Sequence, residues 1–98
     1  MYRELDINDH KDMLNFIKII DIRNRSDYKK GHLLGAINIP LDKLIMDEQK
    51  YLTKDEVYYI VCKYGRQSAL LCEYLSSLGY LVVNCLGGME NWKGELVK

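Results

Sequence analysis

The sequence predicts an α/β fold in which helices cover a mainly parallel sheet. Two observations lead to this prediction. Short apolar runs rich in β-forming residues alternate with segments of helical periodicity, which is typical of layered α/β folds. The 98 residues also contain no repeat, linker or low-complexity tract. A chain of this length lies in the common size range of one compact domain, so we expect a single domain over residues 1–98.

Local signals delimit the elements of the first half of the chain. Asn8 can cap a helix, and Asn24 followed by Asp27 is similar to a capping box. Gly31 ends the second helix, and Pro40 ends a strand because it has no N–H group to donate. The expected elements are an edge strand at Tyr2–Leu5, a helix over Asp9–Phe16, a strand over Ile17–Ile22, a short helix after Asn24, a strand over Ala36–Ile39 and one or two helical turns within Leu41–Asp47.

The second half contains two core strands and a longer helix. Val57–Val61 is apolar and rich in β-forming residues, which predicts a strand buried on both faces. Leucines then recur at helical spacing over Ala69–Leu78, and Gly79 stands where a C-cap glycine belongs. Leu81–Leu86 is the next core strand. A tight turn at Gly87-Gly88 follows, and then a short terminal helix that carries Trp92.

Charge and cysteine content exclude several classes of function. Fourteen basic and fourteen acidic residues cancel, so nothing favours a nucleic acid or a membrane surface as partner. No apolar stretch approaches the roughly 18–20 residues that span a bilayer, and the N-terminus lacks the features of a signal peptide. The three cysteines are odd in number and lack framework spacing, which favours reduced thiols and a cytoplasmic location. No metal site is expected, since neither histidine completes a ligand set.

The segment Cys62–Ser68 is the candidate active site. It places a thiol where a buried strand ends, followed by a short loop and by the start of a helix at Gln67 or Ser68. Gly65 permits a tight loop, and Lys63 and Arg66 bring two cations near the sulfur. A thiolate is stabilised by cations, by inward-pointing N–H groups and by the positive end of a helix. The segment therefore predicts cysteine-based chemistry on an anionic substrate, although a buried packing cysteine is the common alternative.

The other chemically capable residues have simpler interpretations. Cys72 lies within the predicted helix and Cys85 within a predicted strand, so both are expected to be packing residues. His32 follows a helix stop, where a hydrogen bond to the backbone is the expected role. Asp21 and Arg23 stand at the end of a strand, where catalytic residues of α/β folds occur. An ion pair or a loop-bracing hydrogen bond is the favoured interpretation of these two residues.

Three blocks of the sequence together resemble the rhodanese-like domain family, and the resemblance covers nearly the whole chain. The first block joins Asp21-Ile22-Arg23 to the segment from Gly31 to Pro40. The second is the cysteine loop, and the third runs from Gly87 to Trp92 with Gly94 behind it. The blocks follow the order found in the family. The resemblance implies a three-layer α/β/α sandwich around a parallel five-stranded sheet.

The resemblance also implies a sulfurtransferase that works by double displacement. Cys62 would attack the outer sulfur of a donor such as thiosulfate and become a persulfide. An acceptor such as cyanide or a cellular thiol would then carry this sulfur away. Main-chain N–H groups of the loop would hold the persulfide, and cationic side chains would hold the sulfite portion of the donor. The implied substrate-binding residues are Lys63, Tyr64, Gly65, Arg66, Gln67 and Ser68, with Asp21 and Arg23 in support and with no cofactor.

The cysteine loop departs from the family pattern at one position. Active single-domain members often have Arg at the fifth residue after the cysteine, where this chain has Gln67, so the preferred donor stays open. Related phosphatases and arsenate reductases need Cys-x5-Arg, whereas the sixth residue after Cys62 is Ser68, which disfavours phosphatase activity. Two alternatives stand beside a thiosulfate-type enzyme. One is a persulfide carrier supplied by a protein donor, and the other is a non-catalytic module used for docking or sensing.

Overall fold

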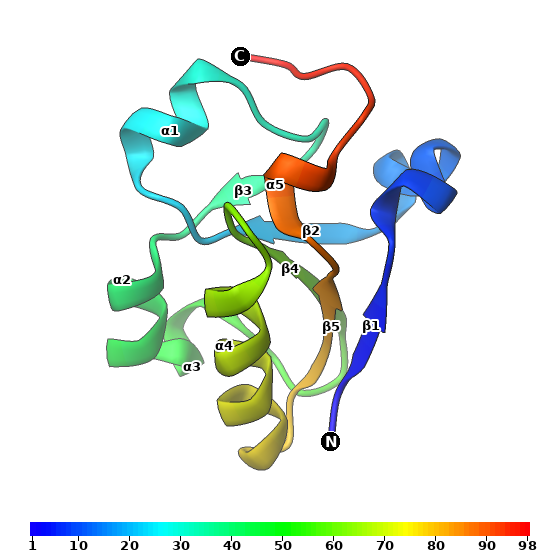
Figure 1. Ribbon diagram of the computed structural model, residues 1–98. Coiled ribbons are helices and arrows are strands. Elements are labelled where there is room, and N and C mark those ends of the chain that lie inside the picture. The colour runs from blue at the N-terminus through cyan, green and yellow to red at the C-terminus, as the bar shows by residue number, and fades with distance from the viewer.

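The computed structural model describes all 98 residues and contains one sheet of five strands (Figure 1). Every neighbouring pair of strands is parallel, and the strand order is β1-β5-β4-β2-β3. The predicted α/β class and the parallel five-stranded sheet are therefore confirmed. The strands are β1 (Arg3–Leu5), β2 (Lys18–Asp21), β3 (Ile37–Asn38), β4 (Val57–Val61) and β5 (Leu81–Cys85).

Helices cover both faces of the sheet, because the central strands are apolar on both sides. On β4, Ile60 packs in the same core cluster as Leu71 and Leu75 of helix α4, while the next residue, Val61, packs in the opposite cluster with Leu14 of helix η1. Both β4 residues are fully buried. One face carries α2 (Leu41–Met46), α3 (Glu48–Tyr51) and α4 (Arg66–Ser77), and the other carries η1 (Ile7–Phe16), α1 (Arg25–Lys30) and α5 (Gly88–Asn91).

The helix expected after Asn8 is a 3-10 helix, η1, and Asn8 does not cap it. The carboxylate of Asp6 accepts a hydrogen bond from the backbone nitrogen of Asn8 at 2.9 Å and caps the helix instead. Asn8 fixes the C-terminal segment. Its side-chain nitrogen donates to the carbonyl of Asn91 at 2.8 Å, and its side-chain oxygen accepts from the backbone nitrogen of Lys93 at 2.8 Å. The predicted cap was wrong because a long-range contact occupies the Asn8 side chain.

Helix α4 begins at Arg66, one residue before Gln67, which is the earliest start that the sequence predicts. Gly65 adopts the left-handed conformation with φ of 86°, and this turns the chain directly from the cysteine loop into the helix. The predicted C-terminal glycine is confirmed, because Gly79 has φ of 100° and its N–H donates to a carbonyl of the last turn at 3.0 Å. The capping role of Asn24 is likewise confirmed by its 2.8 Å hydrogen bond from the Asp27 nitrogen.

Other boundaries also differ from the prediction. β1, β2 and β5 are each one residue shorter than expected at one or both ends. β3 is shorter than expected because it is an edge strand that pairs only with β2, over two residues. Helix α3 follows α2 after a break at Asp47, whose backbone is not helical, and the sequence did not predict it. Trp92 lies one residue beyond α5 and not within it. Its backbone is extended, and its indole N–H donates to the carbonyl of Glu95 at 3.0 Å.

The sheet order brings the chemically capable segments to one edge. β2 and β4 are neighbours, with Asp21 opposite Val61 at their carboxyl ends. The residues that follow these strands, Arg23 and Cys62, therefore emerge at the same edge, where ligands bind in parallel α/β sheets. No helix of the structure has both the length and the apolar character that crossing a membrane requires.

Candidate active site

Cys62 lies at the floor of a cavity formed by the loops after three strands. Only 2% of the residue is exposed, and it borders a cavity of about 680 Å³. The loop after β2 contributes Arg23 to the wall, and the start of α2, which follows β3, contributes Leu41 and Asp42. The cysteine loop contributes the remaining side. Sequence reasoning missed Asp42, although Pro40 marks a strand end that a parallel sheet brings to this same edge.

The sulfur of Cys62 is held by the loop and by the first turn of α4. The backbone nitrogens of Gly65 and Ser68 donate to Sγ at 3.1 Å and 3.3 Å. The thiol in turn donates to the hydroxyl oxygen of Ser68 at 3.2 Å. Sγ therefore stands at the N-terminus of a 12-residue helix, where two N–H dipoles and the partial positive charge of the helix end are directed at it. This arrangement stabilises negative charge on sulfur.

The remaining loop residues divide into two groups. Four side chains line the cavity beside Cys62: Lys63, Tyr64, Arg66 and Gln67. Gly65 and Ser68 do not line it, and they contribute backbone N–H groups from behind the sulfur.

The two cations of the loop face the cavity without a carboxylate partner. Lys63 and Arg66 both line the cavity, and neither takes part in an ion pair. The Lys63 ammonium lies 5.2 Å from the centre of the Tyr64 ring. Two carboxylates, Asp27 and Asp42, border the same cavity, and Asp27 also borders a smaller cavity together with Lys63. The cysteine loop itself carries only positive side-chain charge, which suits an anionic ligand near Sγ.

The Gly87-Gly88 turn, at the start of α5, packs against the backbone of the cysteine loop (Figure 1). The backbone nitrogens that follow the turn bind loop carbonyls: Met89 donates to Cys62 at 2.8 Å, and Glu90 donates to Lys63 at 2.9 Å. A Cβ atom on Gly88 would lie 2.7 Å from the Gly65 nitrogen. The turn must therefore be glycine for the two backbones to approach this closely. The sequence predicts only a tight turn at Gly87-Gly88. It does not predict this contact, because the contact depends on the pairing of β4 with β5.

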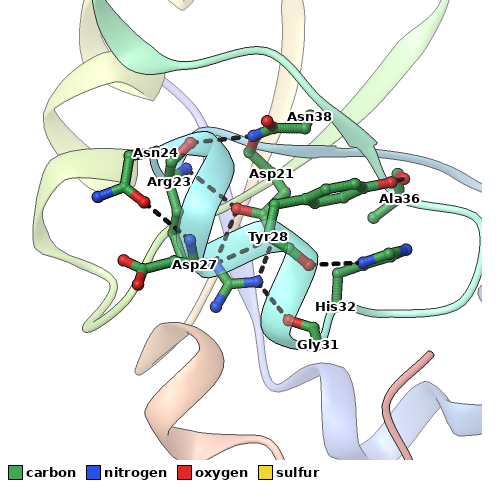
Figure 2. Close-up of polar contacts among 9 residues, drawn as sticks. All are labelled: Asp21, Arg23, Asn24, Asp27, Tyr28, Gly31, His32, Ala36 and Asn38. Atoms are coloured by element: carbon green, nitrogen blue, oxygen red, sulfur yellow. Dashed lines mark hydrogen bonds and ion pairs between the residues drawn. The ribbon is translucent and has the colours of Figure 1, made fainter. Parts of the chain in front are cut away.

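Asp21 and Arg23 form a buried ion pair, which Figure 2 shows with its hydrogen-bond partners. The Asp21 carboxylate is fully buried and accepts from the Arg23 guanidinium through two nitrogens, at 2.7 Å and 3.0 Å. The same guanidinium donates to the carbonyl of Gly31 at 2.8 Å. The side-chain amide of Asn38 donates to the carbonyls of Asp21 and Arg23, each at 2.9 Å. The pair thus fixes the loop between β2 and α1, and Arg23 also borders the cavity.

The other thiols and His32 lie outside the cavity. Cys72 and Cys85 are fully buried, and burial raises the pKa of each thiol to about 12. Both cysteines thus remain protonated packing residues, as the sequence predicts. His32 stacks on Tyr28 at 3.7 Å between ring centres, and its Nδ1 lies 2.8 Å from the Tyr28 carbonyl (Figure 2). The expected backbone hydrogen bond of His32 is confirmed.

Comparison with known proteins identifies the family. A profile of the rhodanese-like domain matches residues 6–95, and the chain therefore belongs to the rhodanese-like domain family. The crystal structure of a rhodanese-like domain protein from Staphylococcus aureus superposes with a TM-score of 0.85 at 34% identity, covering 97% of this chain and 96% of that one. The thiosulfate sulfurtransferase PspE of Escherichia coli is 36% identical over an alignment of 76 residues, and the match covers 74% of this chain and 70% of PspE.

Two longer relatives contain the domain as a part. The putative sulfur carrier protein YrkF of Bacillus subtilis is 31% identical over 81% of this chain, which corresponds to 43% of YrkF. The adenylyltransferase and sulfurtransferase uba4 of Ogataea parapolymorpha is 32% identical over 80% of this chain, and the chain spans only 20% of its length. The relatives of this chain thus include proteins named as sulfurtransferases and one named as a putative sulfur carrier.

Proposed function

We propose that this protein transfers sulfane sulfur from thiosulfate or a similar anionic donor to a thiophilic acceptor through a persulfide on Cys62. One observation carries the proposal. Sγ stands at the floor of the cavity, at the N-terminus of α4, with two backbone N–H groups directed at it and two unpaired cations beside it. The relative PspE, named a thiosulfate sulfurtransferase, supports the same chemistry.

The first step forms the persulfide. The Cys62 thiolate attacks the outer sulfur of the donor, a new S–S bond forms, and the bond between this sulfur and the rest of the donor breaks. With thiosulfate, sulfite leaves with the bonding electron pair. Lys63 and Arg66 hold the anionic portion of the donor, because they are the unpaired cations that border the cavity. Their attraction also stabilises the negative charge that moves onto the leaving group.

The second step returns the thiolate. The terminal sulfur of the persulfide is held near the start of α4, where the N–H groups of Arg66 and Gln67 have no acceptor within the protein. A cyanide ion or a thiolate attacks this terminal sulfur, and Cys62 leaves with the electron pair. Besides this acceptor, the step as proposed uses only residues of the chain. We place the reaction in a reducing compartment such as the cytoplasm, where all three thiols stay unpaired.

The test is the intact mass after incubation with thiosulfate. We expect the wild-type protein to gain the mass of one sulfur atom, and Cys62→Ser to gain none. Cys72→Ser is the matched control, because it removes a buried thiol outside the cavity, and it should gain the sulfur as the wild type does. Addition of cyanide should remove the sulfur and release thiocyanate. Equal sulfur uptake by Cys62→Ser would refute the proposal.

A persulfide carrier that receives sulfur from a protein is the second candidate. A second, largely apolar cavity adjoins the site and shares Leu41, Ile45 and Gln67 with it, while Leu70 and Tyr74 expose apolar surface along its far side. Such a surface suits contact with another protein better than contact with thiosulfate. The relative named a putative sulfur carrier supports this candidate. It predicts that Cys62 carries a persulfide in protein isolated from cells, while turnover with free thiosulfate is slow.

A further inference from the structure

A chain of buried polar side chains leads from Cys62 to the edge of the sheet. Ser68 is fully buried and Asn84 on β5 is 1% exposed. The Ser68 hydroxyl donates to the side-chain oxygen of Asn84 at 2.5 Å, and the side-chain nitrogen of Asn84 donates to the carboxylate of Glu4 on β1 at 2.9 Å. Asn84 does not border the cavity, so it has no direct contact with a substrate there.

The orientation of the Asn84 amide follows from its neighbours. Its nitrogen lies 2.9 Å from the Glu4 carboxylate and 3.3 Å from the carbonyl oxygen of Gly65. A carbonyl oxygen accepts and never donates, so the amide group that faces Gly65 is the NH₂. The Asn84 oxygen must therefore face Ser68. This oxygen has no hydrogen, and the Ser68 hydroxyl must supply the one that joins them.

This assignment fixes the direction of the Ser68 hydroxyl. A hydroxyl has one hydrogen, and Asn84 holds it. Toward Cys62, Ser68 can then only accept, which is the geometry found, with the thiol donating to Oγ at 3.2 Å. Once the thiol proton is lost to solvent through the cavity, an oxygen lone pair faces a sulfur anion. The contact is favourable again only if the Ser68 hydrogen rotates to the sulfur and leaves the Asn84 oxygen without a donor.

We propose that Asn84 is a positioning residue that controls the charge state of Cys62 by holding the Ser68 hydroxyl hydrogen. While Cys62 is a thiol, the Ser68 hydroxyl donates its hydrogen to the Asn84 side-chain oxygen. When the sulfur carries negative charge, as the thiolate, the hydrogen turns to the sulfur and Asn84 loses a buried hydrogen bond. Asn84 thus opposes ionisation, and the two N–H groups of Gly65 and Ser68 favour it. The proposal rests on the proposed function, in which Cys62 is the reacting thiol.

The experiment measures the rate of alkylation of Cys62 by iodoacetamide as a function of pH, read by mass spectrometry on the peptide that contains Cys62. It needs no sulfur donor, so a failure of this proposal and a failure of sulfur transfer are separate results. Asn84→Leu removes the oxygen that holds the Ser68 hydrogen. The hydrogen is then free for the sulfur anion, and we expect the midpoint of the profile to fall by roughly one pH unit, the order of the Ser68–Asn84 hydrogen bond that the wild type gives up on ionisation.

The decisive comparison uses Ser68→Ala as background. If Asn84 acts through the Ser68 hydrogen, Asn84→Leu shifts the midpoint in the wild type and leaves it unchanged in Ser68→Ala. Val82→Ala is the packing control, because Val82 lies two residues earlier on the same strand and packs in the core below α4. It should leave the midpoint at the wild-type value. The other titratable groups near the site are not substituted in these variants: Glu4, Arg23, Asp27, Asp42, Lys63, Tyr64, Arg66, Cys72 and Cys85. Asn84→Leu removes the donor to Glu4 in both backgrounds, so this loss cancels in the comparison.

Two outcomes of the alkylation experiment overturn the proposal. One is an unshifted midpoint in Asn84→Leu, and the other is an equal shift in the Ser68→Ala background, which would show that Asn84 acts on the loop through Gly65. Asn84→Ala serves with the same expectations if the leucine variant does not fold. In the wild-type chain, the NMR signals of the Asn84 side-chain amide should also move over the pH range in which Cys62 ionises. Constant signals there would equally overturn the proposal.

Discussion

Replacement of Gly65 by alanine tests whether the close approach of two glycine turns holds the reactive loop in shape. Gly65 has φ of 86°, and a Cβ atom on it would lie 2.7 Å from the backbone nitrogen of Gly87. Gly35 offers a matched control, because it has nearly the same φ, 83°, and a Cβ on it would meet only the carbonyl oxygen of Leu14, at 3.6 Å. Both variants place an alanine in the left-handed conformation, but only Gly65→Ala also overlaps with the Gly87-Gly88 turn.

The magnitudes follow from this difference. The left-handed conformation costs an alanine about 1–2 kcal/mol, and this applies to both variants. The overlap at Gly65 involves a backbone atom, which cannot rotate away, and adds about 1–3 kcal/mol. In a domain of this size each kcal/mol lowers the melting temperature by about 4–8 °C. We therefore expect Gly65→Ala to melt well below Gly35→Ala.

Activity should separate the two variants further. The Gly65 nitrogen is one of two backbone donors to Sγ, at 3.1 Å, and the overlap displaces it. Loss of one preorganised donor slows related reactions on the order of a hundredfold. We expect persulfide formation from thiosulfate to slow by at least about tenfold in Gly65→Ala and to stay near the wild-type rate in Gly35→Ala, both measured below their melting temperatures. Equal melting temperatures and equal rates would refute the argument from the glycine contact.

Two further predictions concern the buried groups around the site. Because burial raises the pKa of Cys72 and Cys85 to about 12, both should stay protonated and resist iodoacetamide from pH 6 to about pH 9, with reaction beginning only as the pH approaches their raised pKa; equal labelling of all three cysteines in the folded protein at pH 8 would contradict this. Asp21→Asn should lower the free energy of unfolding by about 3–5 kcal/mol in urea titrations, because it leaves the Arg23 guanidinium with little exposure and no carboxylate. Asp27→Asn, at an unpaired carboxylate on the cavity wall, is its control, and a similar loss there would show that the buried ion pair is not the cause.

The parts that the sequence predicts well are those with local causes. β4 has the predicted bounds because its five apolar residues fit a strand buried on both faces. The Asn24 cap and the Gly79 helix end were also predicted, since each depends on residues within one turn. The prediction that Asn8 caps a helix was wrong, because its side chain binds Asn91, more than eighty residues away in the sequence. A cap residue whose side chain has a tertiary partner cannot be recognised from the sequence around it.

The same distinction applies to the site. The thiol, the tight turn and the start of a helix are contiguous in sequence, so the loop could be predicted. The Gly87-Gly88 contact and the role of Asn84 depend on β5 lying beside β4, and a single sequence does not contain that order. Asn84 also interrupts an apolar strand pattern with a buried amide. Buried amides need partners, so this interruption is the one signal that could have drawn attention to it.

Gln67 leaves open which sulfur donor the site prefers, and the position of Arg66 bears on this question. Family members often carry Arg where this chain has Gln67, and a side chain one position earlier on a helix is turned by about 100°. Arg66 nevertheless borders the same cavity as Cys62 and Gln67, and it has no carboxylate partner. Since the cation is displaced and not lost, the site keeps its attraction for an anion while the geometry of the contact changes. We therefore infer that this site still requires an anionic donor, and that the displaced guanidinium changes which donor shape it prefers.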